Sequence, residues 1–115
     1  METRDQQYAK AAFPKVKAQV QAATEKGYRT LALNFPVMVL QSGLSQATGF
    51  LLAKDADEHR AYLNELAGIL GLNNGGDLHQ AVIRSTLPQY QQLTRKALEA
   101  SAWLKRYTQA LLTAD

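Results

Sequence analysis

The sequence predicts an all-α protein: a compact single-domain bundle of about six helices spanning residues 1–115, with a long C-terminal helix. Alanine, leucine and glutamine are abundant, whereas alternating runs of β-branched residues, which are typical of strands, are nearly absent. Apolar residues recur every three or four positions in several segments, as on one face of a helix. A chain of 115 residues can bury one core without disulfides or metals.

The first expected helix runs from Thr3 or Arg4 to about Lys26. Thr3 can cap its start, and Gly27 is a natural C-terminal stop. Its core side is expected to hold six apolar residues: Ala9, Ala12, Phe13, Val16, Val20 and Ala23. Pro14 lies inside this pattern and should kink the helix or break it just before that position, because proline has no backbone N–H.

A short helix is expected at residues 29–33, followed by a third helix from Pro36 to about Lys54. The third helix is apolar on most sides, so we expect it at the centre of the bundle. Gly43 and Gly49 lower its helix propensity, and we expect them to let a neighbouring helix approach closely.

Capping and loop residues delimit two further expected helices between residues 55 and 84. Asp55 can cap a fourth helix that reaches about Leu70. Its inward residues are expected to be Ala56, Leu63, Leu66, Ala67 and Leu70. Residues 73–76, Asn-Asn-Gly-Gly, form the clearest loop of the chain. Asp77 is then expected to cap a short helix over residues 78–84.

The last helix has the strongest pattern. Thr86 and Gln89 have the spacing of a capping box, and Pro88 suits the first turn. Seven residues then form a seam at helical spacing: Tyr90, Leu93, Ala97, Ser101, Leu104, Thr108 and Leu111. At about 100° per residue, Trp103 lies about 100° from the centre of this seam, with Tyr107 between the two.

Composition indicates a cytoplasmic protein. The chain has no cysteine, which excludes disulfides, thiolate zinc sites and cysteine nucleophiles and fits a reducing compartment. The polar segment 1–7 lacks the apolar core of a signal peptide. The most apolar run, residues 35–53, is interrupted by polar side chains that would need partners in lipid, so no membrane association is expected.

Charge is distributed unevenly along the chain. The net charge is +3, with seven basic and three acidic residues in 1–54 and six basic and seven acidic residues in 55–115. A basic first half can attract a polyanion or an acidic protein surface, and it is also compatible with an ordinary solvated surface.

No arrangement of residues typical of catalysis is found, so we expect no enzyme activity, metal, cofactor or small-molecule substrate. His59 and His79 lack a second histidine at ligand spacing. The acidic residues at 55–58 are better explained by the preference of a helix N-terminus for negative charge. The carboxylates of Glu25, Glu65 and Glu99 are isolated, which gives no support to paired-carboxylate chemistry.

Basic side chains beside aromatic rings are the remaining binding features. Lys10 and Lys17 are seven residues apart on the first helix, and Trp103 follows Lys96 by two turns on the last helix. Such a ring can stack on a base or on a partner. Alternatively, Trp103 completes the core and the charges form a solvated rim. The predicted nucleic-acid-binding residues are Arg4, Lys10, Lys15, Lys17, Lys54, Arg95, Lys96, Lys105 and Arg106.

Several segments, in this order, resemble one known family. They are Arg4-Asp5-Gln6 and the alanine-rich helix after it, FPVMVLQSGL at 35–44, GFLLAK at 49–54, and the pattern of Tyr90, Thr94, ALEA at 97–100 and WLKRY at 103–107. Together they resemble the small subunit of the type III-B (Cmr) CRISPR complex. Residues 55–85 show no motif of that family, and Pro14 departs from its pattern.

The resemblance implies a helical bundle without nuclease activity that acts in antiviral defence. Copies of such subunits stack as a filament beside the backbone subunits that hold the guide RNA, and they border the groove for target RNA. The implied partners are therefore the backbone subunits, the large polymerase-like subunit, further copies of the chain, and guide or target RNA.

Stacking of identical copies is a heterologous contact, in which an acidic surface of one copy can meet a basic surface of the next. The predicted protein-interface residues are Asp55, Asp57, Glu58, Trp103 and Tyr107. The alternative function is a free helical adaptor that binds a protein partner and has no nucleic-acid role.

Overall fold

The computed structural model describes residues 1–113, which contain six helices and no strand. The helices are α1 (Arg4–Lys17), α2 (Glu25–Ser42), α3 (Leu44–Lys54), α4 (Asp57–Ile69), α5 (Gly75–Arg84) and α6 (Leu87–Leu111). The all-α class and the long C-terminal helix are confirmed. Positions 114–115 of the expected domain lie outside the described residues.

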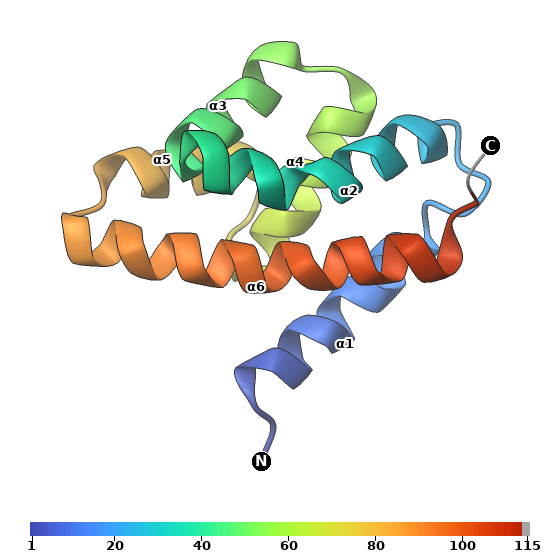
Figure 1. The fold of residues 1–115 in the computed structure, drawn as a ribbon, viewed down its shortest axis with the longest axis horizontal. Helices are drawn as coiled ribbons and strands as arrows, with labels where there is room; N and C mark the ends of the chain where they lie inside the picture. The colour runs from blue at the N-terminus through green and yellow to red at the C-terminus, as the bar shows by residue number, and fades with distance from the viewer. Residues whose placement is uncertain (114–115) are drawn as a thin grey trace.

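α6 runs along the length of the molecule, with α2 on one side of it and α1 crossing it on the other (Figure 1). It begins as predicted: the Thr86 hydroxyl accepts a hydrogen bond from the Gln89 N–H, and the Gln89 side chain accepts one from the Thr86 N–H. The predicted seam faces the core, and its buried members are Ala97, Ser101, Leu104 and Thr108.

α1 is shorter than predicted. Thr3 caps its start, but the helix ends at Lys17 rather than near Lys26. The chain then turns, and Gln21 adopts a left-handed φ of 62°. Ala12 and Val16 are buried as expected, together with Tyr8. The other expected inward positions are partly wrong, since Phe13 and Val20 are 41% and 42% exposed and Ala23 is exposed.

α2 continues through both positions at which a helix boundary was expected. Gly27 lies inside α2 because it packs against α4: a Cβ at this position would lie 2.8 Å from the Cγ of Glu58. Pro36 also lies inside α2 rather than at the start of a helix. Phe35 and Val39 are buried on either side of it, so tertiary packing outweighs the backbone hydrogen bond that proline removes.

The expected single helix from Pro36 to Lys54 is divided at Gly43. This residue has φ 87° and ψ 158°, a conformation that is essentially restricted to glycine, and it separates α2 from α3. Gly49 lies in α3 where α5 approaches, since a Cβ there would lie 3.4 Å from the His79 ring.

The starts of α4 and α5 also differ from expectation. Asp55 closes α3 in a left-handed conformation, with φ 49°, and Ala56 rather than Asp55 precedes α4. Asn74 rather than Asp77 caps α5, because its side chain accepts a hydrogen bond from the Asp77 N–H. Leu63, Leu66 and Ala67 are buried as expected, whereas Ala56 and Leu70 are half-buried.

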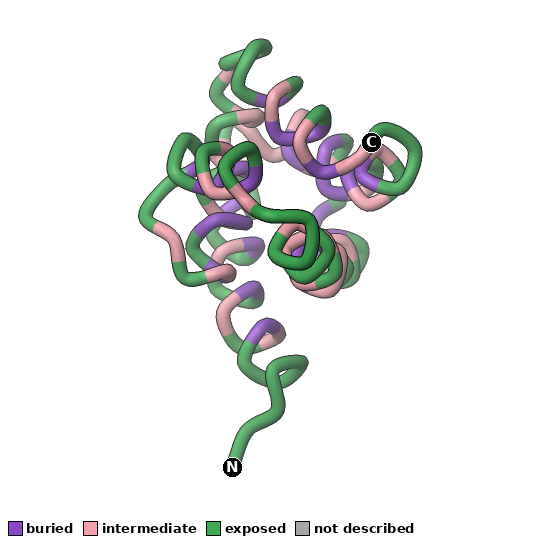
Figure 2. Tube along the Cα trace, turned by 90° about the vertical axis from the view of Figure 1, so that its left-hand side faces the viewer, coloured by how far each residue is buried: buried purple, intermediate pink, exposed green. Residues whose placement is uncertain are grey.

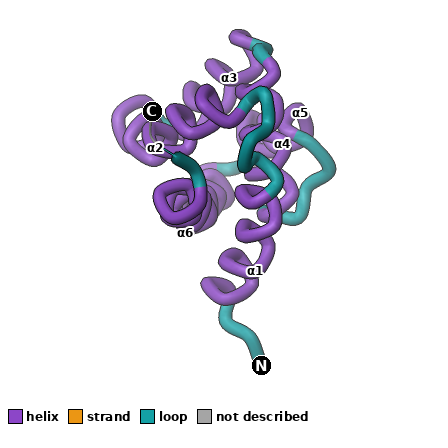
Figure 3. Tube along the Cα trace, turned by 90° about the vertical axis from the view of Figure 1, so that its right-hand side faces the viewer, coloured by secondary structure: helices purple, strands orange, loops and turns teal. Residues whose placement is uncertain are grey.

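The core contains three packed aromatic rings. The Tyr62 ring centroid lies 5.6 Å from that of Tyr28 and 5.2 Å from that of Phe35. Buried residues lie on the inward sides of the helices (Figure 2). The start of α1 extends beyond the bundle (Figure 3). The radius of gyration is 13.2 Å, close to the value of about 13 Å for a compact chain of about 100 residues. Within residues 1–113, no helix is long and apolar enough to span a membrane.

Candidate nucleic-acid interface

The first turn of α1 is tied to the middle of α6. The Arg4 Nε lies 2.8 Å from Glu99 Oε2, and the Arg4 Nη2 lies 2.7 Å from Glu99 Oε1. The hydrogen bond to Glu99 raises the pKa of Arg4. This two-point contact fixes the plane of the guanidinium group at the crossing of the two helices.

Three of the predicted basic residues meet in one polar pocket beside this ion pair. The pocket has a volume of about 160 Å³ and is lined by Arg4 of α1 and by Gln92, Arg95 and Lys96 of α6. Arg4 and Arg95 are separated by most of the sequence, so the helix crossing brings them together. Three cations around one small pocket suit an anion such as a phosphate group.

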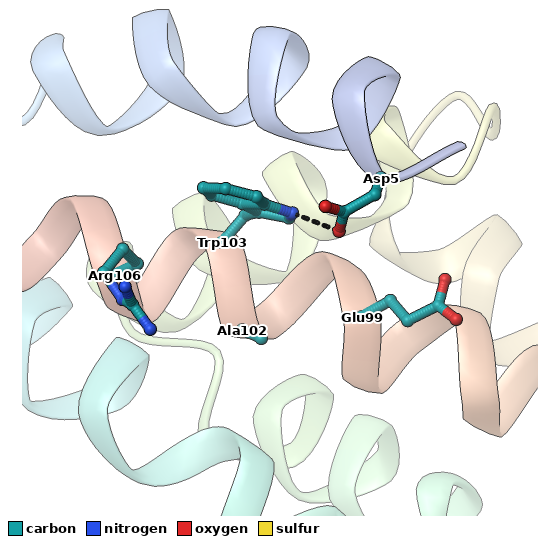
Figure 4. A pocket seen from close by; sticks show the side chains of 5 residues that line it. All are labelled: Asp5, Glu99, Ala102, Trp103 and Arg106. Carbon is teal, nitrogen blue, oxygen red and sulfur yellow. Dashed lines mark hydrogen bonds between the residues drawn. The ribbon is translucent and has the colours of Figure 1, made fainter. Parts of the chain in front are cut away.

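Trp103 lies at the same crossing, farther along α6. Its indole N–H donates a hydrogen bond of 2.8 Å to Asp5 Oδ1, as the dashed line in Figure 4 shows. Its ring centroid lies 5.4 Å from that of Tyr107, and the Tyr107 ring meets the exposed Phe13 ring edge-on at 5.2 Å. Trp103 and Tyr107 therefore contribute to packing between α1 and α6. This agrees with the predicted alternative in which Trp103 completes the core.

Trp103 also lines a pocket of about 280 Å³ together with Asp5, Glu99, Ala102 and Arg106. In Figure 4, Glu99 and Arg106 lie along α6 on either side of Trp103. The half-buried indole thus has a packing role and a surface role, and the alternatives drawn from the sequence are not exclusive.

Two further basic residues lie on the next part of α6. Lys105 and Arg106 line a pocket of about 350 Å³ with Ala102 and Gln109 of α6 and Pro36 of α2. Five of the nine predicted basic residues therefore line pockets along α6 and its crossing with α1. Arg4, Arg95 and Lys96 line one pocket, and Lys105 and Arg106 line another, which shares Ala102 and Arg106 with the Trp103 pocket.

The other four basic residues do not join this surface. Lys10 pairs with Glu2, and Lys17 is exposed in the last turn of α1. Lys15 points toward α4, where its Nζ would lie 3.3 Å from a Cβ at Gly68. Lys54 lies over the Phe50 ring, 5.7 Å from its centroid, at the end of α3. Figure 1 places α3 across the bundle from α1.

The predicted protein-interface residues lie in two separate places. Asp55 and Asp57 are at the junction of α3 and α4, where both contact the guanidinium group of Arg60. Glu58 packs over Gly27, and its carboxylate lies 3.4 Å from the Nδ1 of His59. Arg60 reduces the net negative charge of this segment, and Trp103 and Tyr107 belong to the α1–α6 crossing instead. Among the described residues, no group of three His, Asp or Glu side chains is placed to hold a metal ion.

Sequence reasoning missed a buried polar cluster around Glu65. The Tyr28 hydroxyl donates a 2.6 Å hydrogen bond to Glu65 Oε1, and Gln19 Nε2 lies 3.4 Å from Oε2. Burial raises the pKa of Glu65, and it also raises that of Tyr28. Glu65 looked isolated in the sequence because its partners lie 37 and 46 residues away.

A second missed feature is an open pocket of about 430 Å³ between the end of α2 and α3. It is lined by Met38, Ser42, Gln46 and Phe50. The sequence placed all four residues on one continuous helix, so the bend at Gly43 that creates the pocket could not be foreseen.

Comparison with known proteins gives a consistent family assignment. The model of the family described as CRISPR-associated protein (Cas_Cmr5) matches residues 4–111. The CRISPR system Cmr subunit Cmr5 of Thermus thermophilus is 40% identical over 112 residues, which cover 97% of this chain and 98% of the relative. The X-ray crystal structure of a CRISPR-associated Cmr5 family protein from the same organism superposes with a TM-score of 0.95 at 40% identity, covering 98% of this chain and 100% of that chain.

Proposed function

Because the chain belongs to the Cmr5 family of CRISPR-associated proteins, we propose that it is a non-catalytic small subunit of an RNA-guided Cmr (type III-B) effector complex. The match over residues 4–111 is the observation that carries this proposal, and it agrees with the resemblance of the sequence to that family. The proposed partners are the backbone and large polymerase-like subunits of the complex, in the cytoplasm.

The proposed contribution to RNA binding is a basic border for the target-RNA groove. Arg4, Arg95, Lys96, Lys105 and Arg106 support it, because they lie along one helix and its crossing. Contacts of this kind hold the phosphate backbone and give salt-dependent affinity without sequence readout. An RNA contact stays a prediction for the other four basic residues, and this geometry does not favour it: Lys10, Lys15, Lys17 and Lys54.

Stacking of copies as a filament is the second part of the proposal. A heterologous contact between identical units produces an open filament when the rotation between successive copies does not close a ring. The acidic segment 55–58 supports such a contact less than the sequence suggested, because Arg60 pairs with two of its carboxylates.

Reconstitution tests the proposal. The chain is co-expressed with the other Cmr subunits of its host and a guide RNA, and complexes purified through a tag on a backbone subunit are analysed for this chain. We expect stable incorporation and weaker target-RNA capture by complexes assembled without it. A chain that never co-purifies, and that is captured instead by a partner outside the CRISPR system, would establish the alternative adaptor function.

A further inference from the structure

We propose that the crossing of α1 and α6 is a binding site for a short stretch of single-stranded RNA, in which a base stacks on Trp103 and a neighbouring phosphate is held by Arg4, Arg95 and Lys96. This inference rests on the proposed function and makes one part of it specific. The site combines the pocket of Arg4, Gln92, Arg95 and Lys96 with the pocket that contains Trp103. We call the two together the α1–α6 seam.

The two pockets lie on one face of α6. At about 100° per residue, their lining residues on α6 fall within about a third of the helix circumference over successive turns: Gln92, Arg95, Lys96, Glu99, Ala102, Trp103 and Arg106. The first turn of α1 contributes Arg4 to one pocket and Asp5 to the other. The Arg4–Glu99 ion pair lies between them, so a ligand that crosses this pair touches both pockets.

The polar pocket fits a phosphate. Glu99 occupies the Nε and Nη2 atoms of Arg4, but a guanidinium group has five N–H donors, so donors remain for a second acceptor. Arg95 and Lys96 add two positive charges and Gln92 adds an amide. Because Glu99 already holds the guanidinium group in place, binding costs Arg4 little conformational entropy.

The Trp103 pocket fits a base better than a phosphate. Asp5, Glu99 and Arg106 line it, so two carboxylates face one cation and the pocket favours an uncharged ring over an anion. Asp5 holds the indole through its N–H and Tyr107 packs against the ring, so the platform is oriented in advance. Aromatic stacking tolerates every base, which suits a subunit that must accept any target sequence.

Trp103 is the only tryptophan of the chain, so its fluorescence reports on this pocket alone. We expect a single-stranded RNA 12-mer to quench the emission of the full-length chain at low salt. An abasic oligonucleotide of the same length has the same phosphates and no bases, so it should bind without comparable quenching. If poly-glutamate changes the emission as strongly as RNA does, the seam binds an acidic protein segment and the proposal is overturned.

Variants locate the phosphate contact. Arg95→Glu together with Lys96→Glu should lower the affinity of the reconstituted complex for target RNA at least tenfold. The dependence of log affinity on log salt should become shallower by about 0.7, because the two substitutions remove one phosphate contact and each such contact to a single strand contributes about 0.7. The matched control is Arg84→Glu at the exposed end of α5, which should leave the affinity unchanged.

The role of the ring is tested by two substitutions. Trp103→Leu should weaken RNA binding about tenfold with helicity retained, and Trp103→Phe should restore most of the binding because a benzyl ring still stacks. If Trp103→Leu loses helicity, the RNA affinities of two other variants are compared instead. Trp103→Phe should bind nearly as tightly as the wild type, and the double charge variant should bind at least tenfold more weakly. Normal RNA binding by complexes that contain the Trp103→Leu and the double charge variants overturns this inference alone. Failure of the wild-type chain to enter the complex overturns the proposed function instead.

Discussion

Glu65 shows how a single side chain acquires its properties from distant partners. Its carboxylate, on α4, is largely buried where Tyr28 of α2 and Gln19 donate hydrogen bonds to it and Lys15 lies nearby. Burial disfavours the charged form more than these contacts favour it, so the pKa of Glu65 is raised in the folded protein. At a pH between the ordinary pKa of glutamate and the raised pKa of Glu65, the folded state therefore retains a proton that the unfolded state has already released.

This difference predicts how stability depends on pH. As pH rises from about 4.5, the ordinary value for glutamate, through the raised pKa of Glu65, the folded state binds more protons than the unfolded state, so the free energy of unfolding falls. Glu65→Gln keeps an acceptor for Tyr28 and should remove this decline. Urea unfolding between pH 4 and pH 8 measures it, with Asp77→Asn, which removes an exposed carboxyl group, as control. Parallel pH profiles for Glu65→Gln and the wild type would contradict the prediction.

Gly43 is the second residue whose role is decided by conformation. Its φ of 87° with ψ of 158° is strained for any residue with a Cβ, and the Tyr90 hydroxyl lies 3.2 Å from where that Cβ would be. Gly43→Ala should therefore destabilise the protein by roughly 1–3 kcal/mol, measured by chemical denaturation. Gly68→Ala is the control: Gly68 lies inside α4 with only the flexible Lys15 side chain nearby, so alanine should be neutral or stabilising by up to about 1 kcal/mol. Equal effects at both positions would exclude backbone strain as the cause.

At the scale of elements, boundaries set by local chemistry could be predicted and boundaries set by tertiary contacts could not. The caps at Thr3 and Thr86 are local, because each side chain bonds a backbone group three residues away. Gly27 looked like a helix stop, yet it is required by the approach of Glu58 from α4. Pro36 looked like a helix start, yet buried neighbours hold α2 together around it. In both cases the deciding partner is remote in sequence: Glu58 for Gly27, and Tyr62, against which Phe35 packs, for Pro36.

The local origin of the α6 cap leads to a prediction at this scale. Thr86→Ala removes the acceptor for the Gln89 N–H and should lower the free energy of unfolding by about 1 kcal/mol. Because the two side chains cap reciprocally, the Thr86→Ala, Gln89→Ala double variant should lose less free energy of unfolding than the two single variants lose in sum. Thermal and urea unfolding of the two single variants and the double variant measure this. Full additivity would show that the two hydrogen bonds act independently.

For the molecule as a whole, the sequence indicated the class of fold and named the basic residues of α6 as candidates, and the helix crossings had to come from the structure. Helical spacing alone places Arg95, Glu99 and Arg106 on one side of α6. The sequence cannot show that Arg4 reaches Glu99, because 95 residues separate them and only the packing of α1 on α6 joins them. The same applies to Asp5 and Trp103, which are 98 residues apart.

The arrangement of α1 predicts an uneven distribution of stability. α1 packs mainly on α6 and to a smaller extent on α4, and residues 18–24 connect it to α2. Its ion pair from Arg4 to Glu99 is solvent-exposed on the arginine side, so water and salt screen it and it adds little to the stability of the crossing. α1 is therefore held chiefly by the burial of its apolar side chains.

We therefore expect native-state hydrogen exchange to show lower protection in α1 than in α2 and α4. Val16→Ala, at a fully buried position, should speed exchange in α1 about tenfold, since the lost burial contributes about 1.5 kcal/mol. Because Arg4 and Asp5 line the two pockets of the α1–α6 seam, RNA bound there should slow exchange in α1. Equal protection in α1 and α4, lowered to the same extent in both by Val16→Ala, would mean that α1 opens only when the whole protein unfolds.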